Sequence, residues 1–85
     1  MSTEIPEPSD GPTPVAQLES AAMEVVRQLA ASGDPEAFQA LLRLSGTVGE
    51  SLGISARNVA AASSWTAVAG AAGTSRQAAW SRWKA

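Results

Sequence analysis

Apolar and small residues recur at alternating spacings of three and four along most of this chain, and this spacing constrains the fold more than any other feature. The first series comprises Val15, Leu18, Ala22, Val25 and Leu29. The second continues for 25 residues and comprises Phe38, Leu41, Ser45, Val48, Leu52, Ser55, Val59 and Ala62. Residues three and four apart share one face of an α-helix. The spacing therefore predicts amphipathic helices and an all-α protein.

The residues that flank the first series fit the ends of a helix. Thr13 is a suitable N-cap, and Pro14 follows it at the first helical position, where proline is favoured. Ser32 and Gly33 then interrupt the pattern. We expect a first helix over residues 14–32.

A second helix is expected to begin after Asp34, which is a suitable cap for Pro35. The spacing favours one long helix over residues 35–62. Glycine costs ~1 kcal/mol relative to alanine inside a helix, and the run contains Gly46, Gly49 and Gly53. A split at Gly53 into helices 35–52 and 55–62 is the alternative. Small residues also follow one side of the run, where another helix could approach closely: Gly46, Gly49, Gly53, Ala56 and Ala60.

The apolar content of the chain is dominated by alanine. Of 85 residues, 18 are alanine and only 20 are larger apolar residues, including Met1 and Ile5 in a proline-rich start. A core built from so few large side chains supplies only a few kcal/mol of stability. We therefore expect the chain to self-associate, as a homodimer, through the helix over residues 14–32 and the small-residue side of the next helix.

Charge is distributed unevenly along the chain. Residues 1–50 carry a net charge of −6, whereas residues 51–85 carry four basic residues and no acid, giving +4. Such asymmetry points to an anionic partner for the basic half. Chance unevenness in a short chain is the alternative.

Several classes of protein are disfavoured by composition. The chain has no cysteine and no histidine, which removes disulfides, thiolate catalysis and the commonest metal ligand. We expect no enzyme activity, no metal, no cofactor and no small-molecule substrate. The uncharged segment 58–75 is too rich in alanine, serine, threonine and glycine to span a membrane, so a cytoplasmic protein with no membrane partner is expected. Residues 1–13 are acidic and proline-rich and are expected to form a disordered tail.

The last part of the chain, residues 63–85, contains the pattern of a helical hairpin. Ser64 is a suitable cap for a short helix from Trp65 to Ala72, and Gly73 suits a left-handed turn. Ser75 is a suitable cap for a further helix that begins at Arg76 and ends near Lys84. Four side chains are expected to point inward: Val68, Ala72, Ala79 and Trp83. Two short helices joined by a glycine turn, with the small Ala69 where they cross, form a helix-turn-helix motif.

Residues 64–83, SWTAVAGAAGTSRQAAWSRW, resemble the helix-turn-helix of sigma-factor promoter-recognition domains (the region 4 type). They resemble still more closely small actinobacterial DNA-binding regulators with the pattern S-W-x-x-I-A-x-x-L-G-V-S-R-Q-A-A-x-x-R-[FW]. The matching residues are Ser64, Trp65, Val68, Ala69, Gly73, Ser75, Arg76, Gln77, Ala78, Ala79, Arg82 and Trp83. The chain departs from this pattern at Ala72, where leucine is usual, at Thr74, where an aliphatic residue is usual, and at Ala67, where an acid is common. The resemblance covers about a quarter of the chain.

In a helix-turn-helix, the second helix enters the major groove of DNA. The candidate DNA-binding residues are Thr66, Thr74, Ser75, Arg76, Gln77, Trp80, Ser81 and Lys84. Glutamine can bind adenine through two hydrogen bonds and arginine can bind guanine in the same way. Without DNA, Ser75 would still act as a helix cap, and Lys84 would be an ordinary solvated charge. Arg82 either stays free or pairs with a carboxylate of the earlier helices.

Three tryptophans occupy different expected environments. Trp83 is expected in the core, and Trp65 at the junction with the long helix. Trp80 falls on the exposed side of the last helix, where it would contact either a thymine methyl group or a partner subunit.

These observations predict a small transcriptional regulator that binds double-stranded DNA, with residues 14–62 as a dimerisation and scaffold region and residues 63–85 as the DNA-binding motif. The alternative is a protein-interaction module, a regulatory adaptor whose helix-turn-helix is a scaffold that does not bind DNA. An accessory protein for DNA packaging or plasmid maintenance is a third interpretation.

Overall fold

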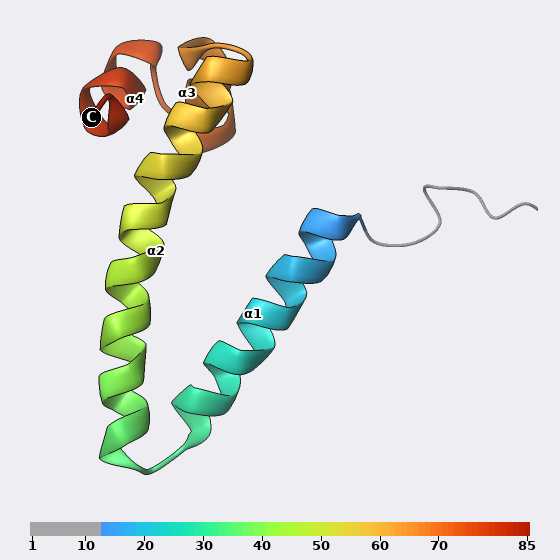
Figure 1. The fold of residues 1–85 in the computed structure, drawn as a ribbon, viewed down its shortest axis with the longest axis vertical. Helices are drawn as coiled ribbons and strands as arrows, with labels where there is room; N and C mark the ends of the chain where they lie inside the picture. The colour runs from blue at the N-terminus through green and yellow to red at the C-terminus, as the bar shows by residue number, and fades with distance from the viewer. Residues whose placement is uncertain (1–12) are drawn as a thin grey trace, which may run out of the picture. The chain divides into compact units, whose positions relative to one another are not determined.

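A computed structural model of the chain describes residues 13–85, and this part is entirely helical apart from caps and turns (Figure 1). Its helices are α1 (Pro14–Ala31), α2 (Pro35–Ala62), α3 (Trp65–Ala72) and α4 (Arg76–Trp83). The prediction of an all-α fold is confirmed. The tail expected over residues 1–13 lies, except for Thr13, outside the described residues.

The predicted caps of the first two helices form. The Thr13 hydroxyl accepts a hydrogen bond from the backbone N–H of Ala16 at 3.0 Å, and Pro14 occupies the first turn. An Asp34 carboxylate oxygen accepts from the backbone N–H of Glu36 at 2.9 Å, at the start of α2. Each cap satisfies a backbone donor that has no partner inside its helix.

α2 is one helix of 28 residues, so the single-helix prediction is confirmed and the split at Gly53 is wrong. The three internal glycines have ordinary helical conformations, since Gly73 alone among the described glycines has a positive φ. The regular hydrogen-bonding of the helix continues through them despite their low helix propensity.

The chain divides inside α2 into two units, with the boundary between Leu41 and Leu42. The first unit contains α1 and the first turns of α2, and Ala37 is its buried residue among those described. Both Val15 and Leu18 of the α1 stripe are 73% exposed. The first unit therefore has an apolar stripe that its own described residues leave largely uncovered.

The second unit contains the rest of α2 together with α3 and α4, which form a helical hairpin (Figure 1). Its core consists of four buried residues, one from α2, two from α3 and one from α4: Ala56, Val68, Ala69 and Ala79. Ala60, Trp65 and Trp83 pack against this cluster and are partly buried. Alanine at these positions lets the helix backbones approach closely but buries little apolar surface.

The turn between α3 and α4 has the geometry that the sequence predicts. Gly73 adopts φ 71° and ψ 34°, the left-handed conformation that favours glycine, and its N–H donates to the Ala69 carbonyl. The N–H of Thr74 donates to the same carbonyl at 3.0 Å. Ser64 and Ser75 cap α3 and α4 by accepting from the backbone N–H groups of Ala67 and Ala78.

One predicted core residue is placed differently. Ala72 was expected to point inward with Val68, but it is exposed. It lies in the last turn of α3, and its methyl group is too short to reach across to α2. An open apolar hollow therefore forms beside it. Leu52, Ser55, Ala56, Val59, Val68, Ala71, Ala72 and Trp83 line the hollow.

Candidate nucleic-acid interface

The candidate interface is the outer surface of the helical hairpin formed by α3 and α4. All eight residues predicted to contact DNA are exposed: Thr66, Thr74, Ser75, Arg76, Gln77, Trp80, Ser81 and Lys84. Five of them come from α4 or its ends, two from the turn that precedes it and one from the first turn of α3. The exposed surface thus follows the helix that the sequence assigns to recognition.

The orientation of α4 is fixed by Ala79, which is completely buried. At 100° per residue, Gln77 and Ser81 lie on the side of α4 opposite Ala79. Trp83, four residues after Ala79, follows it toward the core and is partly buried. This arrangement leaves one side of a short helix free for contact with another molecule.

The first turn of α4 combines a cap with polar groups that remain exposed. The Ser75 hydroxyl accepts from the N–H of Ala78 at 3.1 Å, so its cap function is realised. The neighbouring Arg76 and Gln77 have exposed side chains with donors suited to phosphate or base edges. The N-terminus of a helix also carries a partial positive charge that favours an anion.

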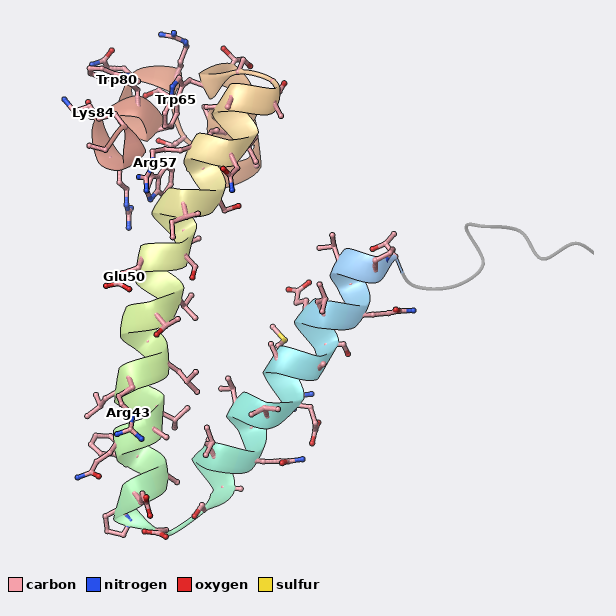
Figure 2. The ribbon with its side chains drawn as sticks, in the orientation of Figure 1. Arg43, Glu50, Arg57, Trp65, Trp80 and Lys84 are labelled. Carbon is pink, nitrogen blue, oxygen red and sulfur yellow. The ribbon has the colours of Figure 1, made fainter. Side chains whose placement is uncertain are left out.

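Trp80 and Lys84 form a pair on the surface of α4. Trp80 is 39% exposed, and the Lys84 ammonium lies over its ring, 4.3 Å from the ring centroid (Figure 2). This distance is well within the range of a cation–π interaction. The pair holds a positive charge against an exposed aromatic surface, one helical turn after Arg76 and Gln77.

Arg57 of α2 holds the C-terminal end of α4, a contact that the sequence reasoning did not anticipate. Its Nη1 donates to the backbone carbonyl of Trp83 at 3.2 Å. Carbonyls in the last turn of a helix have no partner within the helix, and a cation there also complements the helix dipole. From the sequence, Arg57 is recognisable only as one of the basic residues, because the two partners are 26 residues apart.

Arg82 does not pair with a carboxylate of the described residues. The ion pair among residues 13–85 is Arg27 with Glu24, at 3.1 Å on the surface of α1. The Arg82 guanidinium instead lies over the ring of Trp83, 5.1 Å from its centroid. Its charge is therefore available to an anionic ligand.

The second unit is strongly basic. Residues 42–85 contain five basic residues and one acid, Glu50, for a net charge of +4. The basic residues are Arg43, Arg57, Arg76, Arg82 and Lys84. Three of them belong to α4 or its C-cap, which concentrates positive charge beside the exposed polar side chains.

No protein-family model, no curated protein and no solved structure matches the chain. Within the described part of the chain, no cluster of acidic side chains is suited to hold a metal ion. None of the helices over residues 13–85 is both long and apolar enough to cross a membrane.

Proposed function

We propose that the chain is a DNA-binding transcriptional regulator in which α4 reads the major groove of double-stranded DNA. The observation that carries the proposal is the combination, on one short helix, of a buried Ala79 and exposed Arg76, Gln77 and Lys84. The resemblance of residues 64–83 to sigma-factor-like helix-turn-helix regulators supports the same function. In such motifs the N-terminal residues of the second helix contact base edges.

The polar groups of the hairpin divide into two expected roles. Gln77 would bind adenine through its amide, and Arg76 would bind guanine or a phosphate. Thr66, Thr74 and Ser75 lie at helix ends or in the turn, where hydroxyl and backbone N–H groups would contact the sugar-phosphate backbone. Trp80 would contact a thymine methyl group with the edge that Lys84 leaves free.

A homodimer would strengthen this binding. One chain offers few basic residues, and each neutralised phosphate releases counterions, so that affinity depends on the number of contacts and on salt. A dimer would make twice as many phosphate contacts as one chain. The exposed apolar stripes of α1 and α2 are available for the association.

A gel-shift titration with random duplex DNA at low and high salt tests the proposal. We expect salt-sensitive binding that Arg76→Ala and Gln77→Ala weaken without loss of helicity. Arg76→Ala should also reduce the slope of log affinity against log salt by about 0.9, the contribution of one phosphate contact. At a specific site, Gln77→Ala should remove ~1–3 kcal/mol of discrimination at one base pair.

Arg43→Ala is the matched control, because it removes the same charge from an exposed position of α2 outside the hairpin. It should bind DNA as the wild-type chain does. If all three variants bind DNA with equal affinity and equal sequence preference, α4 is not the helix that recognises DNA.

The second candidate function is a protein-interaction module. The observation that favours it is the exposure of large apolar side chains along α1 and α2, among them Leu18 at 73% and Phe38 at 64%. Contiguous exposed apolar surface is typical of protein contacts. Absence of DNA binding at low salt would favour this function over the first.

A further inference from the structure

Trp80 is the tryptophan of the hairpin that the core does not use. It is 39% exposed, whereas Trp65 and Trp83 pack against the buried cluster. Tryptophan is enriched at binding interfaces because it combines a large apolar body with a single polar N–H group. Its place on the surface of α4 makes Trp80 a candidate contact for the ligand of this helix.

Trp80 lies on the open side of α4, beside a residue proposed to contact base edges. The helix turns by about 100° per residue, so each side chain can be placed relative to the buried Ala79. The rotation from Ala79 is about 100° for Trp80, and about 140° for Lys84. It is about 160° for Gln77, in the same direction. Lys84, the C-cap, keeps helical backbone angles, φ −63° and ψ −24°. A groove that Gln77 contacts would therefore also meet Trp80 and Lys84.

The pair of Trp80 and Lys84 presents an apolar surface directly beside hydrogen-bond donors. The Lys84 ammonium lies 4.3 Å from the centroid of the Trp80 ring, held there by a cation–π interaction. Among residues 13–85, no carboxylate forms an ion pair with Lys84. An ammonium covers only part of an indole, so the neighbouring ring surface stays free for an apolar group. Lysine and indole donate hydrogen bonds and accept none. A matching ligand therefore has an apolar group next to a hydrogen-bond acceptor.

One base of DNA presents this combination in the major groove. Thymine carries its C5-methyl group beside the O4 acceptor. Adenine and guanine have no methyl group. Cytosine has neither the methyl group nor the acceptor, since its N4 amino group donates. The chemistry of the pair therefore matches thymine alone among the four bases.

We propose that Trp80 and Lys84 together recognise one thymine in the major groove, with Trp80 against the C5-methyl group and Lys84 donating to O4. This inference rests on the proposed function, because it names a base that the open side of α4 reads beside Gln77. Lys84 then contributes to sequence preference as well as to charge. Since Gln77 is suited to adenine, α4 would prefer a site that contains A·T pairs.

Two base analogues that still pair with adenine separate the two contacts. The probe is a duplex selected from a random library by the wild-type chain, in which each thymine is replaced in turn. Uracil lacks only the C5-methyl group, whereas 4-thiothymine has sulfur, a weak acceptor, in place of O4. At one thymine, uracil should weaken binding by about three- to fivefold, the effect of one buried methyl group. At the same thymine, 4-thiothymine should weaken binding by at least about threefold.

Substitution of each residue should remove one effect selectively. Trp80→Ala should bind the thymine and uracil duplexes equally. Lys84→Met should lose the effect of 4-thiothymine and keep the effect of uracil. Trp80→Phe retains an aromatic ring and should keep most of the effect of uracil. Circular dichroism of each variant checks that helicity is retained.

Arg82→Met is the matched control for Lys84→Met. It removes the same charge from the other flank of α4, about 160° from Lys84 around the helix. The Arg82 guanidinium lies over the ring of Trp83 and not over Trp80. Loss of the charge should lower the affinity for every duplex. The ratios of affinity between the thymine, uracil and 4-thiothymine duplexes should remain those of the wild-type chain.

Contrary results are distinguishable. A selected site without thymine, the lack of a uracil effect at every thymine, or a uracil effect that persists in Trp80→Ala would overturn the contact with the methyl group. A 4-thiothymine effect that persists in Lys84→Met would overturn the contact with O4. If Trp80→Ala changes sedimentation of the chain but not the uracil effect, Trp80 contacts a second copy instead of thymine. Absence of duplex binding at low salt would overturn the proposed function and this inference together, whereas binding without these effects would overturn the inference alone.

Discussion

Truncation of each tryptophan in α4 tests the orientation of this helix, on which the choice of DNA-facing residues depends. Trp83 packs against the cluster of Ala56, Val68, Ala69 and Ala79, whereas Trp80 is 39% exposed. The two residues are three positions apart on a helix of eight residues. They therefore cannot both face the centre of the same small core.

The expected costs differ because the buried areas differ. Trp83→Ala removes about 100–150 Å² of buried apolar surface, which at ~25 cal/mol/Å² corresponds to about 3 kcal/mol of unfolding free energy. Trp80→Ala loses the cation–π contact with Lys84, worth ~0.5–1 kcal/mol at an exposed site, and a smaller packing contact. Alanine also has the higher helix propensity and offsets part of this loss.

Thermal melts followed by circular dichroism separate the two variants. One kcal/mol shifts the Tm of a 60–100-residue domain by ~4–8 °C. We expect Trp83→Ala to lower the Tm by about 12–24 °C and Trp80→Ala by no more than about 8 °C. Trp80→Ala should instead weaken DNA binding or association. If Trp80→Ala melts the fold while Trp83→Ala does not, the orientation of α4 is wrong. The assignment of Arg76, Gln77 and Ser81 to DNA would then be wrong as well.

Two further predictions concern the turn and the C-terminal end of the hairpin. Gly73→Ala should destabilise the second unit by about 1–2 kcal/mol, because φ is 71° at this residue. Gly70→Ala is the control: it lies inside α3, has equally open space around it, and should stabilise the unit by up to ~1 kcal/mol. Urea titrations measure both free energies, and equal effects would contradict the left-handed turn. Arg57→Met should lower the free energy of unfolding by about 1 kcal/mol, because it removes the hydrogen bond to the Trp83 carbonyl. Arg43→Met is the control and should change this free energy by less than about 0.5 kcal/mol. The same titrations measure both variants, and equal losses would show that the contact contributes nothing.

Local features of this fold were predictable because local chemistry determines them. Thr13, Ser64 and Ser75 each accept the backbone hydrogen bond expected of an N-cap. Gly73 is the one described residue that needs a left-handed conformation, and it separates the two short helices. The spacing of three and four also gave the correct extent of α2, since the glycines weaken a helix without requiring it to end.

Contacts between distant residues were less predictable. The prediction that Ala72 belongs to the core was wrong, because a helical pattern identifies a face of the helix but does not show whether a methyl group can fill the space opposite it. The hydrogen bond from Arg57 to Trp83 joins residues 26 apart and has no local signature. The stripe on α1 illustrates the same limit, since periodicity predicts an apolar face without naming what covers it.

The distribution of apolar side chains connects the stability of this chain to its assembly. Ala56, Ala69 and Ala79 make up most of the core cluster, but each contributes little buried area. Larger side chains of α2, including Leu42 and Leu52, remain exposed instead. A partner that binds only the folded chain stabilises it by mass action. Association that covers these side chains would therefore add the burial that the alanine core lacks, and would stabilise the hairpin that presents α4.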